Sequence, residues 1–120
     1  MELIGRLRRA IAGRSEGERV RASWNGAALA ETDRTVVVEG KHYFPPEDVD
    51  WRYLKSSSRH STCRRKGVAS YYTAVVDGRA NEAAAWYYPD PLPAAEAIRD
   101  HVAFSGGVRV LAVEEDERAA

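Results

Sequence analysis

The chain has 120 residues, and its 18 lysines and arginines are balanced by 18 aspartates and glutamates. This length predicts one domain, and a net charge of zero argues against binding nucleic acid or membranes through overall charge. The single cysteine excludes an internal disulfide and a thiolate-rich zinc site. No apolar run approaches the roughly 20 residues that span a bilayer, and no secretion signal is recognisable. We therefore expect a cytoplasmic protein with no membrane or nucleic-acid partner.

Residues 1–13 have the pattern of an amphipathic helix. Leu3, Leu7 and Ile11 recur every four residues, and Gly13 ends the run. Such a helix either covers the core of the domain or offers an interface for a homodimer.

Residues 18–113 are predicted to form a single β-rich domain. Val20 and Ala22 alternate with arginines, which is the period of a half-buried strand. The Asn25-Gly26 pair that follows is a strong hairpin signal, because both residue types tolerate positive φ angles, and 27–30 would return. Further predicted segments of strand are 35–39, 42–44, 68–76, 83–88, 101–104 and 108–113.

Turns and short helical segments separate these strands. Pro93 would open a short helix over 94–100, since proline suits the first helical position. Residues 114–120 begin with four acidic side chains and are predicted to form a solvated acidic tail. The remaining predicted breaks are a helical turn at 46–49 and turns at Gly40-Lys41, Asp77-Gly78 and 105–107, the last of which would close a final hairpin. The pattern as a whole predicts an antiparallel, mainly β domain.

The segment from Trp51 to Lys66 contains six cations and no acidic residue, and it also holds the only cysteine. A thiolate at Cys63 would be favoured by neighbouring cations, which makes Cys63 a candidate nucleophile. Arg64 and Lys66 are candidates for binding a phosphate or carboxylate group. The alternatives are a buried, inert thiol and a solvated turn.

Aromatic residues form a second set of candidates. Flat rings that line a cleft suit a planar ligand, and we expect Tyr71 and Trp86 to form such walls, whereas most of the other rings fill the core. The three histidines lie far apart and in no metal-binding spacing, so we expect no metal and no cofactor.

Several ordered motifs resemble an uncharacterised family, the domain of unknown function 427. They are Trp24-Asn25-Gly26, Tyr43-Phe44-Pro45, Ser61-Thr62-Cys63-Arg64-Arg65-Lys66-Gly67, Ala85-Trp86 and His101-Val102-Ala103-Phe104. The resemblance covers about residues 18–113. It implies a β-tent-like fold, in which two antiparallel sheets meet at a steep angle, and the family is sometimes labelled nucleotidyltransferase-like. Ser61, Arg64 and Ser105 depart from the usual pattern.

Relatives of this fold often hold zinc between two Cys-x-x-Cys knuckles. Here Lys66 resembles a replacement of the second thiol of such a knuckle, and a protonated lysine cannot ligate a metal. We expect Lys66 instead to anchor the turn or to reach toward a ligand.

The sequence thus predicts a domain that binds a planar or anionic small molecule. Tyr71 and Trp86 would be the walls, and Cys63, Arg64 and Lys66 would lie at the mouth. The rival hypothesis is an enzyme, either nucleotidyltransferase-like or dependent on Cys63. Nucleotidyl transfer needs carboxylates that hold magnesium, and no convincing pair is present in the sequence.

Overall fold

The computed structural model describes residues 18–113, and this range is mainly β, as predicted. The predicted helix over 1–13 and the predicted acidic tail over 114–120 lie outside the described residues. The strands are β1 (Val20–Trp24), β2 (Ala27–Thr32), β3 (Val36–Val38), β4 (Lys41–Tyr43), β5 (Leu54–Cys63), β6 (Gly67–Val76), β7 (Arg79–Tyr87), β8 (Ala103–Phe104) and β9 (Arg109–Ala112). Among the described residues, no helix is long and apolar enough to cross a bilayer.

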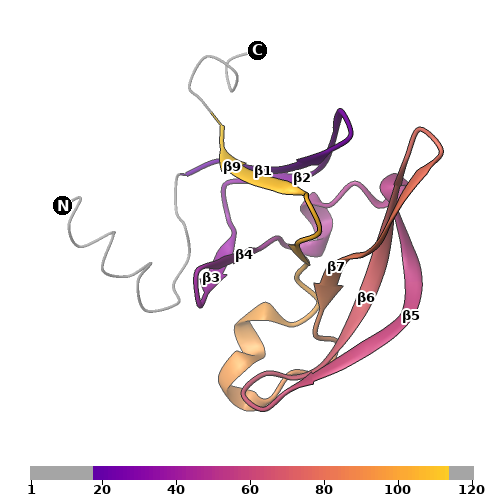
Figure 1. The fold of residues 1–120 in the computed structure, drawn as a ribbon. Coiled ribbons are helices and arrows are strands. Elements are labelled where there is room, and N and C mark those ends of the chain that lie inside the picture. The colour runs from indigo at the N-terminus through magenta and orange to yellow at the C-terminus, as the bar shows by residue number, and fades with distance from the viewer. Residues whose placement is uncertain (1–17, 114–120) are drawn as a thin grey trace.

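The strands form three sheets, with the orders β2-β1-β9, β3-β4 and β5-β6-β7-β8, and all neighbours are antiparallel. Two sheets were expected. The third arises because β3 and β4 pair only with each other as strands, apart from an isolated bridge between Phe44 and Val102. In Figure 1, β1, β2 and β9 run across the top of the molecule, whereas β5 and β6 run from top to bottom.

The first two hairpins follow the turn chemistry of the sequence. Asn25 and Gly26 have φ angles of 50° and 83°, the left-handed pair that joins β1 to β2. Glu39 and Gly40 have φ angles of 51° and 78° and join β3 to β4. This second turn lies one residue earlier than the predicted Gly40-Lys41 turn.

The predicted final hairpin is wrong. Residues 103–104 form β8 and pair with β7, whereas 109–112 form β9 and pair with β1. Gly106 and Gly107, with φ angles of 64° and 90°, carry the chain from one sheet to the other instead of folding it back on itself. The C-terminal strand thereby ties the three-stranded sheet to the end of the four-stranded sheet.

The strand β5 was not predicted from the sequence. It is rich in serine and cations, and most of its side chains are exposed. It pairs only with β6 and is an edge of its sheet, so its polar side chains stay in water and no apolar alternation is required.

The helical segments are all short 3₁₀ turns: η1 (Pro46–Asp48), η2 (Trp51–Tyr53) and η3 (Pro93–Ile98). The predicted helix at 94–100 is therefore a 3₁₀ segment that starts at Pro93 and is broken at Ala95, where φ is −112°. It ends at Ile98 because Arg99 leaves the helical conformation. Asp50 caps η2 by accepting a hydrogen bond from the Arg52 N–H.

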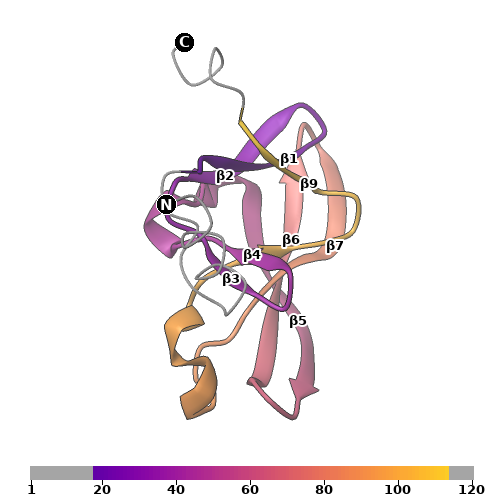
Figure 2. The ribbon, with the colours of Figure 1, turned by 90° about the vertical axis from the view of Figure 1, so that its left-hand side faces the viewer.

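Two clusters of buried apolar side chains hold these elements together. The first contains Leu29, Phe44 and Val102 and joins the three-stranded sheet to the four-stranded sheet. The second contains Tyr43, Tyr88 and Ile98, and it packs the β3–β4 hairpin and η3 against the sheet. Figures 1 and 2 show the hairpin facing one side of β6 and β7, with η3 below it.

Candidate functional site

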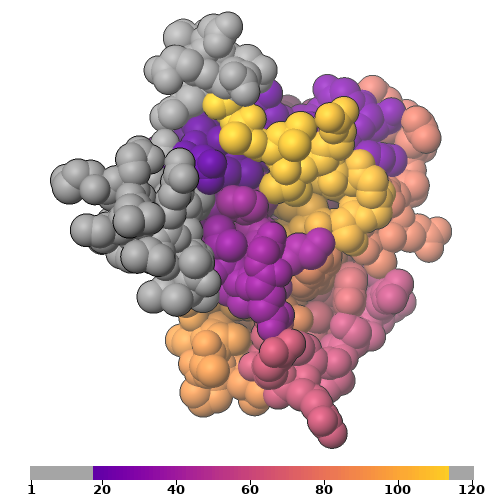
Figure 3. All heavy atoms as spheres, turned by 60° about the vertical axis from the view of Figure 1, so that its left-hand side comes forward, coloured from indigo at the N-terminus to yellow at the C-terminus, as the bar shows by residue number. Residues whose placement is uncertain are grey.

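A cavity of about 450 Å³ lies between the β3–β4 hairpin and the four-stranded sheet. The hairpin provides one wall, β6 and β7 provide the opposite wall, and residues of the β5–β6 turn and of the segment after β8 complete the lining. In Figure 3 the hairpin forms the surface between residues 105–112, shown in yellow, and the β5–β6 turn below. The cavity is partly open to solvent.

Four aromatic side chains line the cavity: Tyr43, Tyr71, Trp86 and Tyr88. Trp86 lies between two of the tyrosines, with ring centroids 6.4 Å from Tyr43 and 6.5 Å from Tyr71. Its indole N–H donates to the Tyr43 hydroxyl over 3.4 Å, and the hydroxyls of Tyr71 and Ser61 share a hydrogen bond of 2.8 Å. These bonds fix the orientation of the rings.

The deeper two tyrosines are neutral at physiological pH. Burial raises the pKa of Tyr43, which is only 2% exposed, and burial raises the pKa of Tyr88 to about 12. Both hydroxyls therefore act as neutral hydrogen-bonding groups, and neither adds negative charge to the cavity.

The charged lining residues are Glu39, Lys41, Arg59 and Lys66. The guanidinium carbon of Arg59 lies 5.1 Å from the centre of the Tyr71 ring, and Lys41 Nζ lies 5.9 Å from the centre of the Trp86 ring. Cations at these distances are attracted by the ring faces. The lining therefore carries three cations and one carboxylate, an excess of positive charge.

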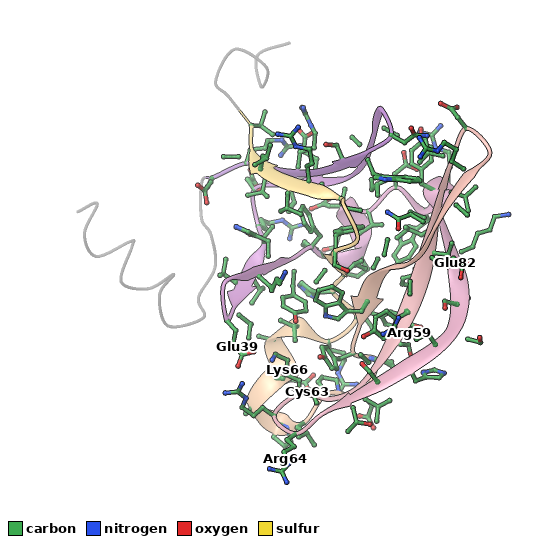
Figure 4. All side chains as sticks on the ribbon, in the orientation of Figure 1. Glu39, Arg59, Cys63, Arg64, Lys66 and Glu82 are labelled. Carbon is green, nitrogen blue, oxygen red and sulfur yellow. The ribbon has the colours of Figure 1, made fainter. Side chains whose placement is uncertain are left out.

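Glu39 and Lys66 form an ion pair that joins the β3–β4 hairpin to the β5–β6 turn, as Figure 4 shows. Lys66 is buried, and Arg65 contacts the second carboxylate oxygen of Glu39 at 2.9 Å. The hydrogen bond from Lys66 lowers the pKa of Glu39. Burial by itself lowers the pKa of Lys66, but the bond to Glu39 and the neighbouring Cys63 thiolate reverse that effect and raise it overall. Lys66 is therefore charged and paired with Glu39.

The conformation of the β5–β6 turn follows from its sequence. The Lys66 N–H donates to the Cys63 carbonyl over 3.3 Å, which closes the turn. Gly67 has a φ angle of 112°, and a β carbon there would lie 3.4 Å from the Asp90 carbonyl oxygen. Glycine is favoured here because L side chains rarely adopt this φ angle. The segment before η3 packs against the turn, and the Leu92 N–H donates to the Lys66 carbonyl over 2.9 Å.

The Cys63 thiol is partly exposed and lies next to this ion pair. Hydrogen bonding from the backbone N–H of Arg65 lowers its pKa, with smaller contributions from the backbone and charge of Lys66, whose Nζ lies 3.9 Å from the sulfur. The largest cause is thus a backbone group rather than the side-chain cations on which the sequence prediction relied. The thiolate is favoured at this position.

Two irregularities in the sheet shape the cavity. Ser56 pairs with Tyr72 and His60 pairs with Ser70, so residues 57–59 face a single residue of β6, and Arg59 leaves this bulge over the Tyr71 ring. In β7, residues 82–84 likewise face Thr73 alone. Ala83 adopts a φ angle of 55° there and lines the cavity, while its N–H donates to the Thr73 hydroxyl over 3.3 Å. Bulges that redirect side chains in this way are common beside binding sites.

The structure brings three of the five predicted site residues to the cavity: Lys66, Tyr71 and Trp86. Cys63 is adjacent to Lys66 but is not among the lining residues. Arg64 is exposed at the tip of the turn and points away from the cavity (Figure 4). Glu39, Lys41 and Arg59 are lining residues that the sequence prediction missed.

Within residues 18–113, no three histidine, cysteine, aspartate or glutamate side chains gather in a geometry that could hold a metal ion. The carboxylate among the described lining residues, Glu39, is engaged by Lys66 and Arg65. The described part of the cavity therefore presents cations and aromatic rings rather than a set of acidic ligands.

A family model described as a domain of unknown function (DUF427) matches residues 13–116. The chain belongs to this family. The match confirms the resemblance stated above and includes every residue of the cavity. No curated protein matches the sequence at a significant level.

Proposed function

We propose that this domain binds a planar or anionic small molecule in the cavity between the β3–β4 hairpin and the four-stranded sheet. The main support for the proposal is the composition of the cavity lining. A volume of about 450 Å³ lies within the range of small-molecule sites, and aromatic walls with a few charged groups are typical of them. Tyr71 and Trp86 are assigned as ring walls, and Lys66 shapes the cavity through Glu39.

Arg64 and Cys63, the other two predicted site residues, are assigned different roles. Arg64 is assigned no ligand contact because it points away from the cavity. Cys63 is assigned a place beside the site, where its lowered pKa supports a thiol-dependent reaction as the second candidate function. Nucleotidyl transfer is less well supported, because the carboxylate among the described lining residues is already paired.

A thermal-shift screen of nucleotides and aromatic anions, with and without Mg²⁺, tests the binding function. A ligand that binds the folded state raises the midpoint of unfolding. The stabilisation should be lost in Trp86→Leu and kept in Trp51→Leu, since Trp51 packs on Tyr72 and lies outside the cavity lining. If no compound stabilises the protein, or if both variants lose the effect equally, the proposed function is wrong.

We also propose the angle between the sheets, the cellular location and the oligomeric state that were expected from the sequence. The steep, β-tent-like angle between sheets would place the cavity where the sheets diverge. A cytoplasmic location would give the protein access to phosphorylated and carboxylated metabolites, and the lone cysteine suits a reducing compartment. A homodimer through the predicted N-terminal helix is tested by measuring mass in solution with and without residues 1–13.

A further inference from the structure

The cations of the cavity differ in whether they already have an anionic partner. Lys66 and the neighbouring Arg65 both bind Glu39. Lys41 and Arg59 form no ion pair with any described residue, and each instead lies against a ring face, Lys41 over Trp86 and Arg59 over Tyr71. The positive charge available to a ligand is therefore that of Lys41 and Arg59.

Lys41 and Arg59, the two lining cations without an ion pair among residues 18–113, enter the cavity from opposite walls. Lys41 is the first residue of β4, on the hairpin, and Arg59 leaves the bulge of β5, at the edge of the four-stranded sheet. The rings beneath them are neighbours, with centroids 6.5 Å apart and planes inclined by 45°. A planar group that lies against these rings would have a cation on each side of it.

We propose that the ligand is an aromatic anion, a planar ring that carries a carboxylate or phosphate, and that Arg59 and Lys41 bind its charged group. This inference rests on the proposed function, because it names the class of molecule that the cavity accepts. The ring packs against Trp86 and Tyr71, and the anionic group replaces solvent around the guanidinium and the ammonium. Arg59 suits this role because its planar donors match the two oxygens of a carboxylate or phosphate. A neutral ring lacks this interaction, and a cationic ring is repelled.

The charge of the lining decides between anionic and cationic ligands. Aromatic rings beside a carboxylate can also form a cage for a quaternary ammonium. Here the faces of Tyr71 and Trp86 already attract two side-chain cations, and Glu39 is neutralised by Lys66. A cationic ligand would be repelled by Lys41 and Arg59, whereas an anionic ligand would be attracted by them.

Calorimetric titration with naphthoate, naphthyl phosphate, the neutral naphthamide and inorganic phosphate tests the inference. One charge-assisted hydrogen bond in a partly solvated site corresponds to about a tenfold change in affinity. Naphthoate or naphthyl phosphate should bind about tenfold or more tightly than naphthamide, and the better of the two identifies the anionic group. Inorganic phosphate should bind more weakly than either, because it lacks the ring.

Three matched variants locate the charge. Arg59→Gln and Lys41→Gln should each weaken binding of the aromatic anion by about tenfold and leave the affinity for naphthamide unchanged. Arg64→Gln removes the same charge from the exposed tip of the turn and should have no effect. Each variant is first shown to be folded by its unfolding transition, and Arg59 and Lys41 are exposed, so their replacement leaves the core intact.

The outcomes separate this inference from the proposed function. If naphthamide binds as tightly as naphthoate and naphthyl phosphate, or if Arg64→Gln weakens anion binding as much as the other two variants, the inference is overturned while the binding cavity stands. If the cationic naphthylmethyl trimethylammonium binds more tightly than either anion, the cavity selects cations. If none of these probes binds while another compound of the thermal-shift screen stabilises the protein, the inference fails and the proposed function stands. If no compound binds in either experiment, both fail.

Discussion

Replacing Gly67 with alanine perturbs the turn on which the arrangement of the site depends. The φ angle of 112° at Gly67 lies outside the regions that L residues occupy readily, and holding a non-glycine residue in such a conformation costs about 1–3 kcal/mol. The added β carbon would lie 3.4–3.6 Å from atoms of residues 90–92, which is ordinary van der Waals contact and adds little. The predicted loss is therefore about 1–3 kcal/mol and comes almost entirely from the backbone.

Urea denaturation of the wild type and of Gly67→Ala measures this loss directly. For a domain of this size, the same loss lowers the midpoint of thermal unfolding by about 5–15 °C. Gly78→Ala is the matched control, because Gly78 has a φ angle of 77° in a hairpin turn, closer to the left-handed region, with no atom within 4 Å of the added β carbon. If Gly67→Ala costs less than Gly78→Ala, the account of the β5–β6 turn is refuted.

Three further predictions concern the surroundings of the cavity. The thiol pKa of Cys63, measured from the pH dependence of alkylation, should lie below the ordinary value of about 8.5 and should rise in Lys66→Met, which removes a nearby cation; a pKa at or above the ordinary value would contradict the geometry. Ala83→Gly should stabilise the fold by about 0.5–1 kcal/mol. A left-handed conformation costs alanine about 1–2 kcal/mol, which exceeds the entropic cost of glycine. A loss of stability in urea denaturation would contradict the strain at Ala83. Because the pKa of Glu39 is lowered in the folded state, its ion pair stabilises the fold above the unfolded-state pKa of about 4.3 and is lost as the pH falls toward the folded-state value. Glu39→Gln should therefore lose less stability than the wild type on acidification. The control is Glu82→Gln, because Glu82 is exposed and forms no ion pair with another described residue, and this variant should follow the wild type.

The sequence predicted those elements whose signals are local. The Asn25-Gly26 and Asp77-Gly78 turns have left-handed φ angles in both residues, as their residue types demand. The long strand β6 and the start of η3 at Pro93 also follow directly from residue type. In each case, neighbouring residues along the chain contain all of the information.

The elements that were predicted wrongly depend on which strands pair, and residue type along the chain does not reveal that pairing. The strand β5 is polar because it is an edge strand. Its own residues show no apolar alternation that would predict a strand, and it forms by pairing with β6, the strand that follows it. The last two strands were assigned to one hairpin because they are consecutive, yet β9 pairs with β1, the first strand of the described chain, and β8 pairs with β7.

The candidate site was predictable in part for the same reason. Tyr71 and Trp86 were recognisable as wall residues because they lie in predicted strands, and the two are directly paired across β6 and β7. Glu39 was not recognisable, since it lies 27 residues from Lys66 in sequence and reaches it only through the fold. Arg59 was counted among the cations of its segment, but nothing in the sequence distinguishes it from Arg64; only the bulge in β5 directs it into the cavity.

The indole N–H resonances of the three tryptophans offer the most direct test of the central claim, which is that the cavity is a ligand site. Trp86 lines the cavity, whereas Trp51 donates its N–H to the Pro46 carbonyl at a different place on the molecule. Titration with naphthoate, followed by NMR, should shift the Trp86 resonance in a saturable way and leave those of Trp24 and Trp51 unchanged. A saturable shift at Trp24 or Trp51 with no change at Trp86, or no shift at any of the three, would contradict the account.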